Sequence, residues 1–313
     1  MNVVVSGATG FIGSHLLPAL LQEGHSVKAL IEPGVSEGVM DGVRSFAADI
    51  VSGDGLSTGF PGAEAVVHLA ARNHVLKETS RDPLAAYRRV NVEGTRNVAQ
   101  AASHAGARLF VHLSSVKAMG EESDRLLDEE SPCVPKTPYG ISKLESEDAV
   151  RVASEECGMT AVLLRLPMVY GPGNKGNLPR MIRWAARGYP FPLFQPDNVR
   201  SMIYVENAVA GILAVLKSAP AGTATYILKD KEDCSTKTIY SIISKELGKR
   251  PRYLPVPAAV VRFGESFSED FRKITGSFRV SSAKVERELG FIPPISVREG
   301  LARTVRWHTR SGC

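Results

Sequence analysis

The stretch that decides the fold is Val3-Val4-Val5-Ser6-Gly7-Ala8-Thr9-Gly10-Phe11-Ile12-Gly13. Its β-branched beginning is typical of a buried strand, and glycines at every third position follow directly. Glycine allows the backbone to turn tightly and to approach a pyrophosphate, which then lies at the N-terminus of the next helix. A tight turn without a ligand is the alternative. The strand before the turn and the apolar helix after it favour a dinucleotide cofactor.

Short β-branched runs alternate with longer helical patterns along the N-terminal half of the chain. This alternation predicts an α/β fold with a doubly wound parallel sheet, the Rossmann arrangement, in which ligands bind beyond the carboxyl ends of the strands. The expected strands are 2–6, 27–31, 65–69, 109–113 and 161–166, and the expected helices are 13–23, 83–106 and 139–157.

The pattern changes after Leu166, where proline and glycine interrupt the periodicity. Strand-like runs return at 200–205 and 225–228, on either side of a helical pattern at 206–218. We therefore expect residues 1–166 to form a dinucleotide-binding domain to which residues 200–228 return. Residues 167–199 and 229–313 then form a smaller, mixed α/β substrate lobe at the C-terminal side.

The composition is that of a soluble globular protein. Of 313 residues, 43% are hydrophobic and 23% are charged, and the formal net charge of +5 suits an anionic substrate. The basic residues form no long block, which argues against nucleic acid as a partner. The four cysteines stand far apart without a CxxC pair, which predicts free thiols and no metal site.

The sequence also gives an expectation about location. No leader precedes the first strand, and no apolar run approaches the roughly 20 residues that span a bilayer. We expect a cytoplasmic protein without a membrane partner.

Glu32 follows the second expected strand, where the adenosine ribose of a dinucleotide would lie. A carboxylate accepts hydrogen bonds from the ribose hydroxyls and repels a 2′-phosphate, so Glu32 favours NAD over NADP. An exposed glutamate at the end of a strand is the alternative, and NADP stays open. Asp49 and Ile50 are expected near the adenine, and residues 69–71 offer a floor of small side chains beside the cofactor.

Tyr139 and Lys143 stand one helical turn apart. A tyrosine with a reference pKa of about 10 is a weak base at neutral pH, but a nearby ammonium and an oxidised nicotinamide lower that pKa. The phenol can then exchange a proton with the substrate while hydride moves to or from the nicotinamide. Ser115, at the carboxyl end of the fifth strand, offers the substrate oxygen a second donor, and Asn91 is expected to brace this region. Taken singly, each of these residues could serve only the helix or strand in which it stands. Their order between the expected strands favours a catalytic site.

These motifs together resemble the extended short-chain dehydrogenase/reductase family, in its sugar-nucleotide epimerase/dehydratase branch. The matching stretches cover most of the chain and are specific for the family as a set. They are residues 6–13, 67–71, 91–95, 113–115, 138–143, 165–173 and 200–205.

The resemblance implies that Ser115 is the catalytic hydroxyl, Tyr139 the base and acid, and Lys143 the stabiliser of the phenolate. On the substrate side it implies that Asn177 and Arg200 hold the diphosphate of a UDP-sugar, since a guanidinium fork suits phosphate oxygens. Lys117 is implied for the sugar, and Phe194 for the base, with a place in the core as the equal alternative for Phe194. The contacts implied for NAD are Gly7, Gly10, Phe11, Ile12, Gly13, Glu32, Asp49, Ile50, Leu69, Ala70, Ala71, Asn91, Tyr139, Lys143 and Pro167.

Three departures from the family pattern bear on specificity. Ile31 stands where many epimerases have aspartate, so the preference for NAD rests on the next residue, Glu32. Lys117 lies in a segment that commonly ends in Val-Tyr-Gly, which alters the sugar pocket. No Asp-Glu pair follows Ser115, whereas members that remove water from the sugar carry one, so a 4,6-dehydratase is disfavoured.

The leading hypothesis is oxidoreduction at C4 of a UDP-hexose or UDP-N-acetylhexosamine by a 4-epimerase. A reductase of a UDP-4-keto-6-deoxy sugar is the main alternative, and Glu32 favours the epimerase because it suits a retained NAD. A dinucleotide-sensing regulator would not need the catalytic residues, and a steroid or flavonoid dehydrogenase would give Arg200 no partner.

The resemblance further implies a homodimer in which helices 83–106 and 139–157 pair with their copies. Four small or apolar residues offer contact surface there, although packing in the core would explain them equally. They are Val98, Ala101, Ala102 and Ala149.

Overall fold

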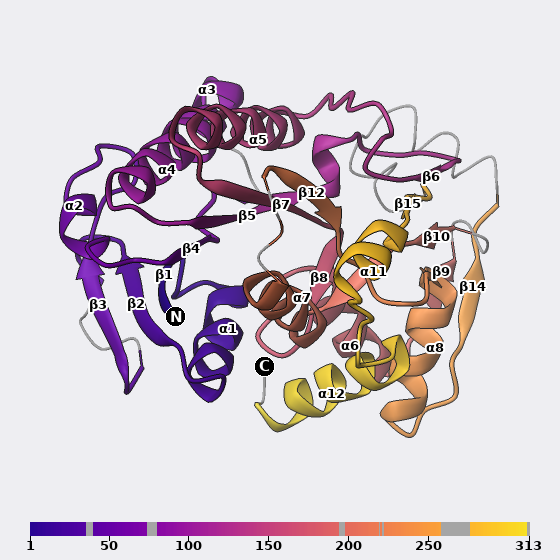
Figure 1. The fold of residues 1–313 in the computed structure, drawn as a ribbon. Helices are drawn as coiled ribbons and strands as arrows, with labels where there is room; N and C mark the ends of the chain where they lie inside the picture. The colour runs from indigo at the N-terminus through magenta and orange to yellow at the C-terminus, as the bar shows by residue number, and fades with distance from the viewer. Residues whose placement is uncertain are drawn as a thin grey trace.

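A computed structural model describes residues 1–35, 40–73, 80–193, 198–218, 220, 222–257 and 276–311. Its centre is a seven-stranded parallel sheet in the order β12-β7-β5-β4-β1-β2-β3 (Figure 1). The chain first builds outward from β1 to β3 and then crosses back to β4, which confirms the predicted Rossmann arrangement. The strands are β1 (Asn2–Ser6), β2 (Ser26–Ile31), β3 (Val43–Ala47), β4 (Ala65–His68), β5 (Leu109–Ser115), β7 (Thr160–Leu166) and β12 (Ala224–Ile227).

Helices cover both faces of this sheet (Figure 1). One face packs against α1 (Phe11–Gln22) and α7 (Val205–Ser218), and α11 (Ala283–Leu289) lies beside α7 and β12. The other face carries α2 (Leu56–Gly59), α3 (Pro83–Arg88), α4 (Gly94–His104) and α5 (Pro138–Cys157). A sheet covered on both sides needs apolar residues at successive positions, which is why Val3, Val4 and Val5 are all buried.

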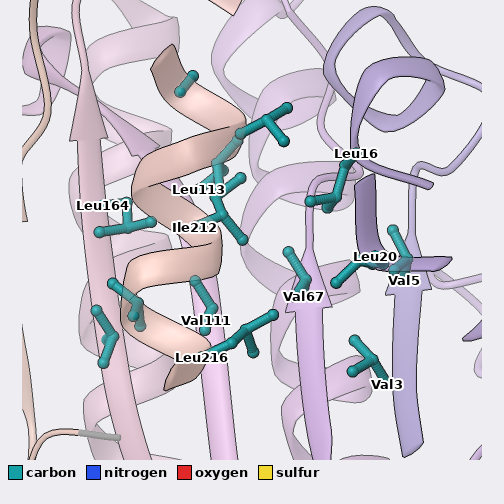
Figure 2. Close-up of a cluster of buried hydrophobic side chains, with 14 of the residues drawn as sticks. Val3, Val5, Leu16, Leu20, Val67, Val111, Leu113, Leu164, Ile212 and Leu216 are labelled. Carbon is teal, nitrogen blue, oxygen red and sulfur yellow. The ribbon is translucent and has the colours of Figure 1, made fainter. Parts of the chain in front are cut away.

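Alternating side chains of the strands feed two separate cores. Figure 2 shows Val3, Val5 and Val67 pointing toward Leu16 and Leu20 of α1. The intervening side chains of the strands enter the second core, against α4 and α5. Its buried strand members are Val4, Leu30, Val66, Phe110, Ala161 and Leu163.

The helical pattern at 83–106 is not one regular helix. A π-helical turn, η1 (Arg89–Glu93), separates α3 from α4. Such turns alter the direction of the side chains that follow and are frequent at functional sites. Val98 and Ala102 of α4 are fully buried in the core of the monomer, so the expectation that they form a dimer contact is wrong for these two residues.

The remaining elements pack beside the carboxyl edge of the sheet as helices and short strand pairs. The strand-like run 200–205 divides into β10 and β11, which pair with β13 and β8 and do not join the large sheet. Among the described residues, no helix is both long and apolar enough to cross a membrane. The elements are η2 (Val116–Ala118), β6 (Leu126–Leu127), β8 (Met168–Tyr170), α6 (Asn177–Ala186), β9 (Phe191–Leu193), β10 (Val199–Arg200), β11 (Met202–Tyr204), β13 (Cys234–Ser235), α8 (Thr236–Glu246), β14 (Tyr253–Pro255), β15 (Arg279–Val280) and α12 (Val297–Arg310).

A buried carboxylate joins these elements to the sheet. Asp230, which follows β12, accepts hydrogen bonds from the Tyr170 hydroxyl (2.8 Å), the Tyr204 backbone N–H (2.9 Å) and the Asn207 amide (2.7 Å). Burial raises the pKa of Asp230, and the three donors oppose that rise. One side chain thus fixes β8, β11 and α7 relative to the edge of the sheet.

Candidate active site

The predicted site residues lie at the carboxyl edge of the sheet, where parallel strands end side by side. The glycine turn directly follows β1, and residues 69–71 directly follow β4. Ser115 is the last residue of β5, and Pro167 follows β7. The four strands β1, β4, β5 and β7 are neighbours in the sheet, so these segments come together along one edge.

The glycine turn requires glycine at two of its positions. Gly7 has a φ of +70°, and a Cβ on it would lie 2.6 Å from the backbone nitrogen of Ala70. A Cβ on Gly13 would lie 2.4 Å from the carbonyl oxygen of Ala8. The absence of side chains therefore lets the turn pack against the loop after β4 and brings α1 close to it.

This turn fits the pyrophosphate of a dinucleotide. Helix α1 begins after Gly10 without a hydrogen bond from a capping side chain and without an acidic residue in its first turn. The N–H groups at the beginning of a helix attract an anion, and the helix dipole adds to that attraction. The residues present are therefore suited to the phosphates of NAD.

The residues predicted for the adenosine half lie beyond β2 and β3. Glu32 is exposed immediately after β2, as ribose recognition requires. Asp49 uses its carboxylate locally, because it accepts the Val51 backbone N–H at 2.7 Å. Ile50 packs against α4, where a Cβ on Gly94 would meet its side chain at 2.9 Å. Contact of Asp49 and Ile50 with adenine stays a prediction.

Asn91 holds the loop after β4 against α5. It is fully buried in the π-helical turn, where its Oδ1 accepts the Arg72 N–H at 2.7 Å. Its Nδ2 donates to the Arg72 carbonyl at 3.1 Å and to the Ser142 hydroxyl at 2.9 Å. The bracing expected from the sequence is therefore direct and involves the backbone.

Tyr139 and Ser115 meet as the sequence predicts. A hydrogen bond from Ser115 favours the phenolate of Tyr139, but burial is the larger effect and raises the pKa of Tyr139 to about 12. Tyr87 packs edge to face against the Tyr139 ring, with 5.9 Å between ring centroids, and Arg72 lies over the Tyr87 ring at 5.3 Å. Tyr87 and Arg72 could not be predicted as part of the site, because neither belongs to a motif.

Lys143 lies one turn after Tyr139 on α5, and this residue is 2% exposed. Its ammonium donates to the Leu113 carbonyl at 2.7 Å and lies 3.4 Å from Nε2 of His112. Burial lowers the pKa of Lys143 from 10.5 to about 8, and the charge of Glu147 opposes that fall. A buried ammonium therefore stands one helical turn from the phenol.

The sequence analysis also missed a buried acid behind Lys143. Glu147 is fully buried and forms an ion pair with Arg165 of β7 at 2.8 Å. Its only signal in the sequence is its place four residues after Lys143, which is the same spacing that separates Tyr139 from Lys143.

The residues predicted to hold the sugar nucleotide lie on the substrate side. Arg200 is half-buried and donates from Nε to the Gly276 carbonyl at 2.8 Å. Burial lowers the pKa of Arg200, and the charge of Glu122 opposes this. Glu206, the carboxylate six residues after Arg200, pairs with Arg303 at 3.0 Å. The structure therefore shows no ion pair between Arg200 and Glu206.

The other substrate contacts stay predictions. Asn177 is exposed at the beginning of α6. Lys117 donates to the Glu121 carbonyl at 2.9 Å, and its ammonium lies 5.4 Å from the centroid of the Phe278 ring. Phe194 lies outside the described residues.

Lys143→Met should raise the melting temperature at pH 7, because an apolar side chain of similar length removes the cost of burying an ammonium. The pKa of Lys143 is about 8 in the folded protein against an ordinary 10.5, so the unfolded chain binds more protons between these values. The wild-type protein consequently gains stability as the pH rises through that window. The variant should exceed the wild type in free energy of unfolding by an amount on the order of 3 kcal/mol below pH 8, and this difference should disappear above pH 10.5.

Thermal unfolding from about pH 6 to about pH 10 measures this difference. Lys217→Met, which changes an exposed lysine of α7, is the matched control and should show no such trend. An advantage of Lys143→Met that grew with pH would show that Lys143 is not buried as an ammonium.

Comparison with known proteins agrees with this geometry. The model of the NAD dependent epimerase/dehydratase family matches residues 3–227. A UDP-glucose 4-epimerase of Vibrio cholerae is 30% identical over 312 residues, which are 97% of this chain and 94% of that protein. A dTDP-glucose 4,6-dehydratase of Streptomyces griseus is 28% identical over 98% of this chain and 94% of its own. The solved structure of MoeE5 with UDP-glucuronic acid and NAD is 26% identical and has a TM-score of 0.82, over 99% of this chain and 100% of that one. The chain belongs to the NAD dependent epimerase/dehydratase family, as its motifs predicted.

Proposed function

We propose that this protein catalyses oxidoreduction at C4 of a UDP-sugar, as a 4-epimerase of a UDP-hexose or UDP-N-acetylhexosamine. The observation that carries the proposal is the convergence of Ser115, Tyr139 and Lys143 at the sheet edge that also carries the glycine turn. The relative from Vibrio cholerae is named a UDP-glucose 4-epimerase, and the MoeE5 structure contains a UDP-sugar. Both names support UDP as the nucleotide.

Bound NAD would supply the hydride acceptor and donor, together with a positive charge near the phenol. The residues of the chain handle the proton. Tyr139 takes it at Oη from the sugar hydroxyl and returns it, while the Ser115 hydroxyl donates a hydrogen bond to the same sugar oxygen. The ammonium of Lys143 stabilises the phenolate, because an opposite charge nearby favours the ionised form. This is needed because burial raises the pKa of Tyr139 to about 12, even with the hydrogen bond from Ser115.

The alternative is one-way reduction of a UDP-4-keto-6-deoxy sugar. Residues 114–117 and 169–177 resemble that subgroup as much as the epimerases. Glu32 favours the epimerase, since its exposed carboxylate suits the ribose hydroxyls of a retained NAD. Mass spectrometry of the purified protein distinguishes the two, because a retained NAD supports the epimerase and an empty site that takes NADPH supports the reductase.

Tyr139→Phe should fold normally, bind NAD, and lose between about a hundredfold and about ten-thousandfold in turnover, because only the phenolic hydroxyl is removed. Turnover of UDP-glucose and UDP-N-acetylglucosamine measures the loss. Tyr240→Phe is the matched control, since it also removes a tyrosine hydroxyl, one that donates to the Tyr189 carbonyl away from the site. Near-native turnover by Tyr139→Phe would remove tyrosine from the mechanism.

Arg200→Ala should weaken UDP binding and leave NAD binding unchanged. A guanidinium in a partly closed site contributes roughly 1.5–3 kcal/mol to binding a diphosphate, which is roughly a ten- to hundredfold rise in Kd. Calorimetric titration with UDP measures the change, and Arg279→Ala is the control because Arg279 is exposed and pairs with Asp233 at 3.2 Å. Unchanged UDP affinity with a lower melting temperature would make Arg200 a structural residue.

We also propose a homodimer formed by the outer faces of α4 and α5. A groove between them is lined by residues of both signs, among them Arg96, Glu145 and Asp148, together with the exposed Val152. Such a face can complement its own copy about a two-fold axis. Sedimentation at micromolar concentration should give twice the chain mass, and a monomer there would contradict the assembly.

A further inference from the structure

Helix α5 carries four polar residues in a row at intervals of one turn. They are Tyr139, Lys143, Glu147 and Arg151. Residues spaced in this way lie above one another on one face of a helix. Lys143 and Glu147 are both buried, so this row runs from the active site inward between α5 and the sheet. The order is a phenol, a cation, an anion and a cation.

Glu147 is held in this row by groups from three elements. Its Oε1 accepts the hydroxyl of Ser114 at 2.5 Å and Nε of Arg165 at 3.0 Å. Its Oε2 accepts Nη2 of Arg165 at 2.8 Å and Nη2 of Arg151 at 3.2 Å. The side chain of Glu147 is 0% exposed. Two guanidinium partners offset the cost of burying this carboxylate, which would otherwise lose its hydration without compensation.

We propose that Glu147 is a positioning residue for catalysis, whose buried negative charge one turn behind Lys143 keeps that lysine in the ammonium form. The proposal rests on the proposed function in one respect, which is the role of the ammonium in stabilising the Tyr139 phenolate. The hydrogen bonds of Glu147 to Ser114 and Arg165 fix the distance from which its charge acts.

The charge of Glu147 matters because, in the described part of the chain, the other groups that face Lys143 do not supply a negative charge. From β5, the contacts are the Leu113 carbonyl and His112, and His68 of β4 stacks on His112 with 5.5 Å between ring centroids. Burial lowers the pKa of His68 to about 3 and that of His112 well below its ordinary value, so both rings are neutral. On α5, Tyr139 is protonated at rest.

The two guanidinium groups act in the opposite direction. Arg165 of β7 and Arg151 of α5 are cations beyond Glu147, and their charges disfavour an ammonium at Lys143. Glu147 stands between them and Lys143. Because the pKa of Lys143 is already lowered to about 8, the balance of these charges decides whether the lysine is charged at neutral pH.

Glu147→Gln tests this inference, because the amide keeps the shape and an acceptor for Ser114 and Arg165 while the charge is lost. In ¹⁵N-lysine-labelled protein without ligands, the side-chain NMR signal of Lys143, identified by its absence in Lys143→Met, should titrate near pH 8 in the wild type. In Glu147→Gln its midpoint should fall by about one pH unit or more. Asp148→Asn is the matched control: Asp148 also pairs with Arg151, but its side chain is 65% exposed, so the midpoint should stay.

A second variant covers the case in which Glu147→Gln does not fold. Arg151→Gln removes a positive charge beyond the same carboxylate and leaves its two hydrogen bonds with Arg165 in place, so the midpoint of Lys143 should move in the opposite direction, to higher pH. If the titration midpoint of Lys143 shifts in opposite directions in the two variants, the cause is the change in charge. Loosened packing would shift the midpoint in the same direction in both variants. An unchanged midpoint in Glu147→Gln, or an equal change in Asp148→Asn, would overturn the inference.

Kinetics then connects the titration to catalysis. The upper limb of the pH profile of turnover should move to lower pH in Glu147→Gln by the same interval as the NMR midpoint. Since the titration uses the protein without substrate, it holds or fails independently of which sugar nucleotide is turned over. A moved midpoint without UDP-sugar turnover by the wild type would reject the proposed function alone.

Discussion

The site depends on holding one ammonium, that of Lys143, between α5 and the sheet. Burying a charge costs more than one hydrogen bond returns, so the side chain is tolerated only because its surroundings are built for it. The Leu113 carbonyl receives the ammonium, the neutral His112 ring lies beside it, and Glu147 supplies the opposite charge. These contacts fix the depth and rotation of α5 against β5. Tyr139, one turn earlier on α5, can therefore meet Ser115 at the end of that strand.

The substrate side is positioned by a second buried polar group. Asp230 follows β12 and binds Tyr170 of β8, the backbone of Tyr204 in β11, and Asn207 of α7. Because Arg200 lies four residues before Tyr204, its place relative to the sheet is set through this carboxylate. Loss of the Asp230 contacts would release β8 and β11 together, since β8 and β11 pair only with each other in the described part of the chain.

Features that depend on neighbouring residues could be predicted from the sequence. Features that depend on contacts between residues far apart in the chain could not. The strand at 2–6 and the requirement for Gly7 follow from a β-branched run and a tight turn. The π-helical turn could not be predicted from the sequence, because none of its residues interrupts the helical pattern. It is fixed instead by the contacts of Asn91 with residues 19 and 51 positions away. Glu147 was overlooked for a related reason: a glutamate on a helix is usually exposed, and only its pairing with Arg165 makes burial tolerable.

One segment near the C-terminus contacts two of the residues that the sequence assigns to the sugar nucleotide. Arg200 donates to the Gly276 carbonyl, and Lys117 lies over the Phe278 ring. This segment lies outside residues 3–227, which the family model matches. The residues predicted to bind NAD thus lie within the part that the family model matches, whereas Arg200 and Lys117 also contact a segment beyond it. Relatives named as an epimerase and as a dehydratase are 30% and 28% identical to this chain, so overall identity does not distinguish the two reactions.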